Sequence, residues 1–342
     1  MAVSLNDLEH VLNLTKDLWP SVAGKRIFVT GGTGFFGKWL LESFACCNRK
    51  LGLEASMVVL SRDPEGFAGD CPHLGTRADI EFHKGDVRSF DFPAGNFDFV
   101  IHAATQASAT LNAEEPELVI DTIIDGTKRV LEFAGRCGAG RVLFASSGAA
   151  YGRQPPEVAN VPEDYAGAPD TGDPASAYGE AKRLAELLCS IWRQRHGIDT
   201  VIARGFAFVG PYLNLDIHYA VGNFIRDGLA GGPIRVLGDG TALRSYLYAA
   251  DLAVWLWTIL LRGKGGRVYN VGSDEGISIA DLAQRVSDCF RHSPEVLIAR
   301  EPAAGPVQRY VPSIERAGRE LGLRVWTGLD EAISRTIEFY QR

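Results

Sequence analysis

The sequence predicts an α/β fold in which a doubly wound parallel sheet is joined to a smaller, mixed α/β C-terminal lobe. Three observations predict it. From residue 26 onward, short runs of β-branched and aromatic residues alternate with helical stretches. The first of these runs leads directly into a glycine-rich turn at residues 31–37. Beyond residue 204 the alternation loosens into glycine, proline and aromatic residues over 205–248, and shorter elements follow.

The first residues of the chain predict a helical extension, which we assign to residues 1–24. Ser4 and Asp7 are spaced as a capping box, and leucines repeat at helical intervals after them. We therefore expect a short amphipathic helix over 5–16 that packs on the body of the protein. The segment has neither the basic start nor the apolar block of a secretory signal.

The hydrophobic periodicity then assigns the elements of the main body in order. A proline-rich stretch over 154–173, between the strand expected at 141–145 and the helix expected at 175–196, is expected to be a loop. We expect strands at 26–30, 56–60, 80–84, 97–101, 141–145 and 200–204, and helices at 34–49, 116–137, 175–196 and 278–290.

Composition and charge exclude several classes of protein. Hydrophobic residues make up 46% of the 342 residues and charged residues 23%, so a full core can be buried. The net charge of −7 leaves no basic surface for nucleic acid or an anionic membrane. Polar residues interrupt even the longest uncharged stretch, 99–113, so no segment is expected to span a membrane. The six cysteines form neither CxxC nor a Cys/His cluster, and we expect reduced thiols, no metal site and a cytoplasmic location.

The turn after the first strand has the spacing GxxGxxG. Its glycines, Gly31, Gly34 and Gly37, let the backbone turn sharply and approach a pyrophosphate, whose charge the N-terminus of the next helix stabilises. Three glycines alone are a weak signal, but the strand before them and the helix after them agree with it. We therefore expect a dinucleotide-binding domain of the Rossmann type over 25–204, with later returns near 240–272, and a mainly substrate-binding lobe over 205–342.

Arg62, just after the second strand, bears on the choice of cofactor. A domain that binds the ribose 2′-hydroxyl of NAD places Asp or Glu there, whereas this sequence has Ser61-Arg62-Asp63. A guanidinium can pair with a 2′-phosphate, so we expect NADP; NAD is the alternative, with Asp63 on the ribose. The residues expected at the cofactor are Gly31, Gly34, Phe35, Phe36, Gly37, Ser61, Arg62, Asp86, Val87, Ala103, Ala104, Thr105, Tyr178, Lys182 and Phe206.

A tyrosine and a lysine four residues apart predict acid–base chemistry. Tyr178 and Lys182 share one face of the helix expected over 175–196, so the ammonium can favour the phenolate and make the tyrosine a usable proton acceptor. The pattern occurs by chance on many helices. Ser147 favours a catalytic role for the pair, because it follows the fifth strand at the sheet edge where α/β proteins bind ligands. Its hydroxyl can hold a substrate oxygen there.

With glycine turn, serine and YxxxK in this order, the chain resembles the extended short-chain dehydrogenase/reductases, specifically the NAD(P)-dependent epimerase/dehydratase family acting on nucleotide sugars. The resemblance covers roughly residues 25–320. Further matches are Val100-Ile-His-Ala-Ala104, Gly126-Thr127, Ala149-Ala-Tyr-Gly152, Gly210-Pro211, Gly238-Asp-Gly240, Arg244 to Leu252 and Tyr269-Asn-Val-Gly272.

The resemblance implies a nucleotide-activated hexose that is oxidised or reduced at C4 by hydride exchange with the nicotinamide. It implies Tyr178 as acid and base, Lys182 as its electrostatic partner and Ser147 on the 4-oxygen. It also implies a homodimer formed through the helices over 116–137 and 175–196. For the substrate diphosphate, Arg244 is the best candidate and Asn223 a weaker one.

Two departures from the family pattern bear on the reaction. Dehydratases and decarboxylases of the family carry a glutamate two residues before the tyrosine of the TyrGly pair, and the dehydratases add an aspartate before it. Those positions are Ala149 and Gly148 here, and neither can transfer a proton. The favoured reaction is therefore that of an NADPH-dependent 4-ketoreductase or a 4-epimerase. The alternatives are a 4,6-dehydratase and a non-catalytic protein that senses NADP(H).

Three further departures concern the substrate contacts. Ile123, Ala207 and Ser245 stand where the family has Asn, Asn and Asp, so the diphosphate contacts are expected to differ. His102 lies in an apolar strand and is expected to be a hydrogen-bonded core residue.

Overall fold

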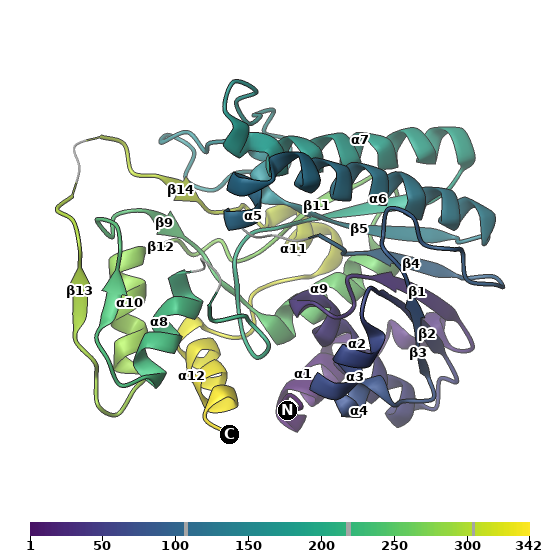
Figure 1. Cartoon of the computed structure of the whole chain (residues 1–342), viewed down its shortest axis with the longest axis horizontal. Helices are drawn as coiled ribbons and strands as arrows, with labels where there is room; N and C mark the ends of the chain where they lie inside the picture. The colour runs from purple at the N-terminus through teal and green to yellow at the C-terminus, as the bar shows by residue number, and fades with distance from the viewer. Residues whose placement is uncertain (106–108, 217–219, 303–304) are drawn as a thin grey trace.

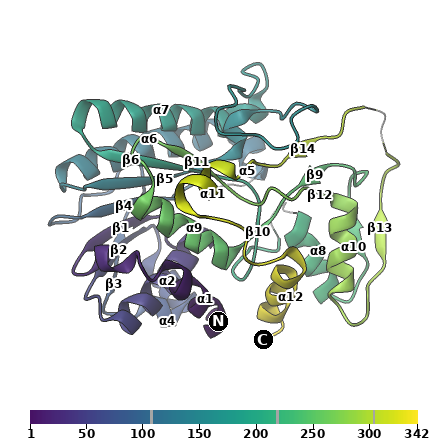
Figure 2. The ribbon, with the colours of Figure 1, turned by 180° about the vertical axis from the view of Figure 1, so that it is seen from behind.

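A computed structural model describes residues 1–105, 109–216, 220–302 and 305–342. In this part of the chain the main sheet is parallel, with strand order β11-β6-β5-β4-β1-β2-β3. Helices α6 and α7 cover one face, and α2 and α9 cover the other (Figures 1 and 2). Strands such as β1 and β5 are buried on both faces, which is why they stand out in the sequence as continuous apolar runs, whereas the edge strand β3 is partly exposed. The predicted doubly wound α/β fold is confirmed. The strands are β1 (Arg26–Thr30), β2 (Ser56–Ser61), β3 (Ile80–Lys84), β4 (Phe99–His102), β5 (Arg141–Ser147), β6 (Asp199–Gly205) and β11 (Val268–Val271).

The helices predicted over 34–49, 116–137 and 175–196 are present beside this sheet with ends shifted by at most two residues, whereas the other flanking helices were not predicted. One difference is at the start of α7, where Pro174–Ser176 forms a separate 3₁₀ turn before the helix begins at Ala177. The flanking elements are α2 (Phe35–Leu51), α3 (Pro64–Asp70), α4 (Pro72–Gly75), α5 (Ala109–Glu114), α6 (Pro116–Arg136), α7 (Ala177–His196), α9 (Ala249–Arg262) and α11 (Glu315–Leu321), with 3₁₀ turns η1 (Trp19–Val22), η2 (Gly148–Tyr151) and η3 (Pro174–Ser176).

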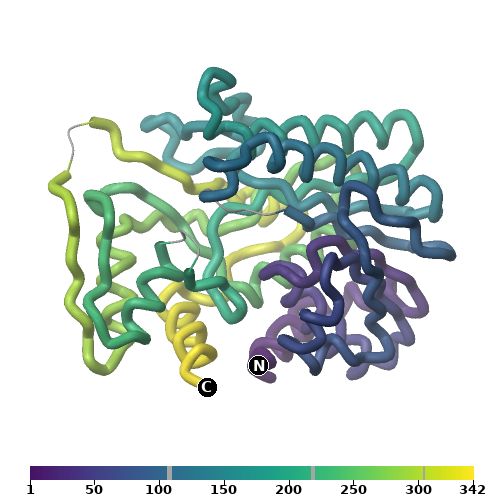
Figure 3. Tube along the Cα trace, in the orientation of Figure 1, coloured from purple at the N-terminus to yellow at the C-terminus, as the bar shows by residue number. Residues whose placement is uncertain are grey.

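The remaining elements form a smaller lobe beside the carboxyl ends of the strands (Figure 1). Its short strands pair into three small sheets, of which one joins β9 to β12 and β14. The chain leaves this lobe along β14 and passes back to the main sheet, as the tube in Figure 3 shows. The elements are β7 (Phe208–Val209), α8 (Ala220–Leu229), β8 (Ile234–Val236), β9 (Leu243–Arg244), β10 (Leu247–Tyr248), β12 (Ile277–Ser278), α10 (Ile279–Asp288), β13 (Val296–Ile298), β14 (Arg309–Tyr310) and α12 (Leu329–Tyr340).

The N-terminal helix α1 (Leu5–Thr15) packs against α2 and α9. The side chain of Ser4 caps it, as the capping-box spacing predicts. Asp7 is buried and accepts hydrogen bonds from Tyr248 at 3.0 Å and from Arg335 of α12 at 2.6 Å. The first helix therefore links the main sheet domain to the last helix of the chain. No helix in the described ranges is long and apolar enough to cross a membrane.

Candidate active site

The three glycines of the turn after β1 differ in what a side chain at each position would meet. Gly31 has φ +74°, and a Cβ on it would come within 2.5 Å of the backbone of Ala103. A Cβ on Gly37 would lie 2.3 Å from the Gly31 carbonyl oxygen, so both glycines are needed by the fold itself. Gly34 differs, because a Cβ there would meet only the Gly31 oxygen, at 3.5 Å. The fold itself therefore does not require a glycine at position 34.

The carboxyl ends of β2 and β3 carry the residues expected at the adenosine. Arg62 is exposed, whereas Asp63 caps α3 by accepting from the Gly66 amide at 3.0 Å. Asp86 pairs with Arg88 at 2.8 Å, and this pair, with a smaller effect of Arg62, lowers the pKa of Asp86. Two arginines thus flank this carboxylate. Sequence reasoning missed Arg88, because only the fold shows that it turns back onto Asp86.

His102, at the end of β4, is a structural residue. Its ring bonds Thr30 on one side at 2.8 Å and Thr127 on the other at 3.1 Å. Complete burial, with a smaller effect of Lys182, lowers the pKa of His102 to about 3, so the ring is neutral. The Thr30 hydroxyl also accepts from the Ala104 amide at 3.2 Å, which fixes the backbone of Ala103 and Ala104 opposite Gly31.

Lys182 is buried where β5 and α7 meet. Its side chain is 2% exposed, and Nζ donates to the Ala145 carbonyl at 2.7 Å and to Thr105 Oγ1 at 2.8 Å. The same Nζ lies 5.8 Å from the centre of the Tyr178 ring. Burial lowers the pKa of Lys182 to about 7, although the carboxylate of Glu186 works in the opposite direction. A lysine so close to its neutral form responds strongly to the charges around it.

Asn112 on α5 positions the start of α7 and was not anticipated from sequence. Helix α7 has no side-chain cap of its own from Ser176. Asn112 Oδ1 instead accepts from the Tyr178 amide at 3.0 Å, while its Nδ2 donates to the Ala175 carbonyl at 2.9 Å. The residue that orients the first turn of α7 therefore comes from another helix.

Ser147 ends β5 beside an aromatic pair from distant parts of the chain. Its Oγ accepts from the Ala149 amide at 3.1 Å and lies 3.4 Å from the hydroxyl of Tyr310. Tyr310 stacks on Phe206, with ring centres 4.6 Å apart. A Cβ at Gly148 would lie 2.7 Å from the Phe206 ring and 2.8 Å from the Tyr310 hydroxyl. The aromatic pair thus fills the space that a side chain at position 148 would need.

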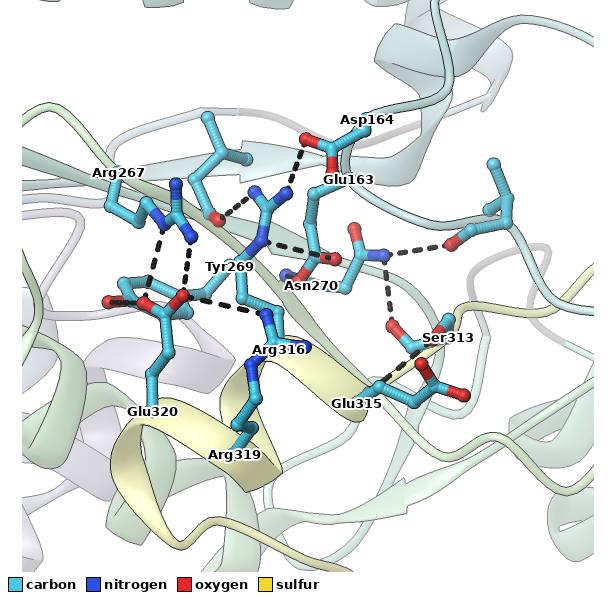
Figure 4. A network of polar contacts seen from close by, with 12 residues as sticks. Glu163, Asp164, Arg267, Tyr269, Asn270, Ser313, Glu315, Arg316, Arg319 and Glu320 are labelled. Atoms are coloured by element: carbon cyan, nitrogen blue, oxygen red, sulfur yellow. Dashed lines mark hydrogen bonds and ion pairs between the residues drawn. The ribbon is translucent and has the colours of Figure 1, made fainter.

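A buried polar network fixes the segment that carries Tyr310 (Figure 4). Arg316 donates to the Val268 carbonyl at 3.0 Å and pairs with Asp164 and, at 3.7 Å, with Glu163. Asn270 of β11 donates to the carbonyls of Val161 and Ser313, at 2.9 and 3.0 Å. Burial raises the pKa of Glu163, which accepts from the Asn270 amide. The proline-rich loop and the segment after β14 are therefore both held against the main sheet.

The two residues predicted to bind the substrate diphosphate lie in the smaller lobe. Arg244 on β9 donates to the Leu243 carbonyl at 2.8 Å, and its guanidinium lies 6.0 Å from the Tyr310 ring. It forms no ion pair with a carboxylate of the described residues. Asn223 is half-buried on α8. Within the same described ranges, no group of three or more His, Cys, Asp or Glu side chains could hold a metal ion.

The chain is similar to known proteins in sequence and in fold. The model of the NAD dependent epimerase/dehydratase family matches residues 27–272. UDP-glucuronic acid decarboxylase 6 of Arabidopsis thaliana is 31% identical over 87% of this chain and 83% of its own length. The dTDP-glucose 4,6-dehydratase of Streptomyces antibioticus is 26% identical over 92% of each chain. The UDP-glucose 4-epimerase of Thermus thermophilus, solved in complex with NAD, is 26% identical with a TM-score of 0.76, over 92% of this chain and 99% of the other.

Proposed function

The chain belongs to the NAD dependent epimerase/dehydratase family, and from this premise we propose that it oxidises or reduces C4 of a nucleotide-activated hexose. The cofactor accepts or supplies the hydride. The observation that carries the proposal is the meeting of Lys182, Tyr178 and the end of β5, with Nζ bonded to the Ala145 carbonyl and 5.8 Å from the phenol ring. An ammonium at this place favours the phenolate.

The roles of the side chains follow from their chemistry. Ser147 donates a hydrogen bond to the C4 oxygen and holds it beside the phenol. In oxidation, Tyr178 takes the proton from the C4 hydroxyl as the C4 hydrogen leaves as hydride; in reduction, Tyr178 returns a proton to the ketone oxygen. Lys182 stabilises the phenolate in both directions.

The surroundings of Gly148 favour a ketoreductase or an epimerase over a dehydratase. A dehydratase needs an acid and a base beyond the tyrosine, to remove water across C5 and C6. Phe206 and Tyr310 occupy the space in which a side chain at position 148 would stand, and Ala149 has no proton to transfer. The remaining groups suffice for hydride exchange at C4.

Decarboxylation is a second candidate, because decarboxylases are among the relatives that match most of this chain. Oxidation at C4 of a hexuronate gives a β-keto acid, which can lose CO₂ without the acid–base pair that dehydration needs. The lack of a carboxylate at Ala149 is the observation against it.

One substrate panel separates these reactions. The purified protein is given UDP-, dTDP-, GDP- and CDP-hexoses, UDP-glucuronate and an NDP-4-keto-6-deoxyhexose. Oxidation of added NADPH by the 4-keto sugar identifies a ketoreductase; conversion of an NDP-hexose to its C4 epimer without net change in cofactor identifies an epimerase. Release of CO₂ from UDP-glucuronate identifies a decarboxylase. Tyr178→Phe should abolish each activity and spare cofactor binding, and an undiminished rate would refute the acid–base assignment.

The adenosine end supports NADP as the cofactor. Arg62 is exposed, Arg88 pairs with Asp86, and Asp63 is already engaged as a helix cap. A 2′-phosphate would meet cations here. The weaker candidate is NAD, which the T. thermophilus epimerase structure holds. Calorimetric titration with NADP⁺ and NAD⁺ decides between them.

The substrate and the assembly are proposed on similar grounds. Arg244 and Asn223 are proposed to bind the diphosphate from β9 and α8.

The outer faces of α6 and α7 expose Ile120, Leu184 and Leu187, of which the last two are 46% and 54% exposed. We expect these two helix faces to form the interface of a homodimer. Leu187→Glu should give a monomer in analytical ultracentrifugation. Leu237→Glu, at an exposed leucine of the smaller lobe, is the control and should leave the dimer intact.

A further inference from the structure

Glu186 is a buried carboxylate that the proposed mechanism does not use. It lies on α7 four residues after Lys182, and the residue is 7% exposed. Residues four apart share a helix face, so the carboxylate and the ammonium both point toward the sheet. A charged group in this position has to be paired, and its partners show what it holds.

The partners of Glu186 come from the two strands beneath α7. Oε1 accepts from the hydroxyl of Ser146, the residue before Ser147, and from Arg204 Nε at 2.9 Å. Oε2 accepts from the terminal nitrogen Nη2 of Arg204 at 2.5 Å. Arg204 lies on β6, and its guanidinium sits 4.4 Å above the ring of Tyr151. The bidentate pair leaves the carboxylate little freedom to turn.

The same carboxylate acts on Lys182 through its charge. Burial disfavours the ammonium, and Glu186 is the first of the groups that oppose this effect. The buried Lys182 and the partly buried Arg204 thus share one carboxylate. If Glu186 were neutral, Lys182 and Arg204 would still lie beneath α7. None of the partners described above would then supply a negative charge to them.

We propose that Glu186 is a positioning residue for the acid–base pair: it ties the serine-bearing end of β5 to α7 and keeps a negative charge beside the ammonium of Lys182. The inference rests on the proposed function, because it gives Glu186 the role of positioning Tyr178 and Lys182 for that reaction. It predicts that neutralising the carboxylate makes Tyr178 harder to ionise.

Other titratable groups around Lys182 do not supply this charge. On α7 they are Tyr178 and Cys189, and burial raises the pKa of the thiol to about 12. His102 of β4 is neutral. Tyr151 of η2 has a pKa raised by burial to about 12, and Arg204 of β6 is a cation. From α6 the buried residues are Thr127 and apolar side chains. Glu186 is the carboxylate among the charged groups that act on Lys182.

The test measures ionisation of Tyr178 directly, in protein loaded with NADP⁺ or, if it binds more tightly, NAD⁺. Phenolate absorbance is followed against pH, and the step that Tyr178→Phe removes is assigned to Tyr178. Glu186→Gln should weaken the ammonium of Lys182 and thereby move the midpoint of the Tyr178 step up by about one pH unit. This is the lower end of the effect that a neighbouring opposite charge, here the ammonium, has on a pKa. Glu180→Gln is the matched control, a half-exposed glutamate of the same helix paired with Arg183, and should leave the midpoint unchanged.

The tie to β5 is tested separately with Ser146→Ala. This variant keeps every charge, so the midpoint should stay, while displacement of Ser147 should lower kcat by on the order of tenfold, measured with the most active sugar of the panel. Glu186→Asp keeps the charge on a shorter arm and should behave like Ser146→Ala. If Glu186→Gln does not fold, these two variants carry the test, and unchanged kcat in both would overturn the proposal.

The outcomes separate this inference from the function on which it rests. If Tyr178→Phe removes no ionisation step from the titration of the loaded protein, Tyr178 is not the titrating group and the proposed function fails. If Tyr178→Phe removes the step but Glu186→Gln leaves its midpoint unchanged, the proposed function stands and the role of Glu186 is overturned.

Discussion

Replacing Lys182 with methionine should make the protein more stable near neutral pH and inactive. In the folded protein the pKa of Lys182 is lowered by burial from 10.5 to about 7. Because the unfolded chain holds the proton more tightly, the ammonium destabilises the fold. This cost is complete below the folded-state pKa, where both states are protonated, and it vanishes above the unfolded-state pKa, where both are neutral.

The magnitude follows from the two pKa values. At about 1.4 kcal/mol per pH unit, the full cost is about 5 kcal/mol near pH 6, and it falls to about 2 kcal/mol near pH 9. Methionine also loses the hydrogen bonds of Nζ to the Ala145 carbonyl and to Thr105, a loss of about 2 kcal/mol at either pH. The variant should therefore be more stable by about 3 kcal/mol near pH 6 and roughly equal near pH 9.

Urea unfolding followed by far-UV circular dichroism at several pH values between these limits measures the difference. The informative quantity is the change in free energy of unfolding between wild type and Lys182→Met as pH rises, because other titrating groups are shared by the two proteins. Parallel pH profiles would refute the reasoning, since they would mean that the lysine keeps an ordinary pKa in the folded state.

Three further substitutions test other parts of the site. Arg62→Ala should weaken NADP⁺ binding by about tenfold or more and leave NAD⁺ binding unchanged in calorimetric titration, because it removes a charge-assisted bond to the 2′-phosphate; equal effects on both would contradict the assignment. Gly34→Ala should keep the melting temperature but lose cofactor affinity, since a Cβ there is tolerated by the protein, whereas Gly31→Ala, 2.5 Å from backbone, should lower the melting temperature too. Asn112→Ala should cost about 1 kcal/mol in urea unfolding and lower kcat, because Tyr178 loses the acceptor of its amide; an unchanged kcat would show that α7 needs no such anchor.

Local pattern predicted the strands β1 to β6 of the main sheet, but not its edge strand β11. The strand over 26–30 was predicted with its observed bounds, because a buried strand is apolar on both faces and the glycine turn marks its end. At β4 the prediction began two residues early. Phe97 belongs to the core, but the Asp98 carboxylate receives hydrogen bonds from Lys25 and the Arg26 amide, so the ladder begins at Phe99.

The parts of the site that the sequence did not reveal depend on contacts between distant residues. Tyr310 approaches Ser147 across 163 positions, and Asn112 caps α7 across 66. Neither residue has a local pattern that sets it apart from an ordinary surface residue. Glu186 could have been noticed, because a carboxylate four residues after Lys182 falls on the helix face that the apolar residues assign to the core. Its partners on β5 and β6 required the fold.

The bond between Asp7 and Arg335 joins residues 328 positions apart. On a ribosome, α1 therefore emerges long before α9 and α12, against which it is finally anchored. Its buried side chains, such as Leu8 and Val11, can pack on α2 early but lack the cover of α9 and α12 in the growing chain. We expect the nascent protein to expose part of this strip until α9 and α12 have been synthesised, so that the final docking of α1 comes late in its maturation.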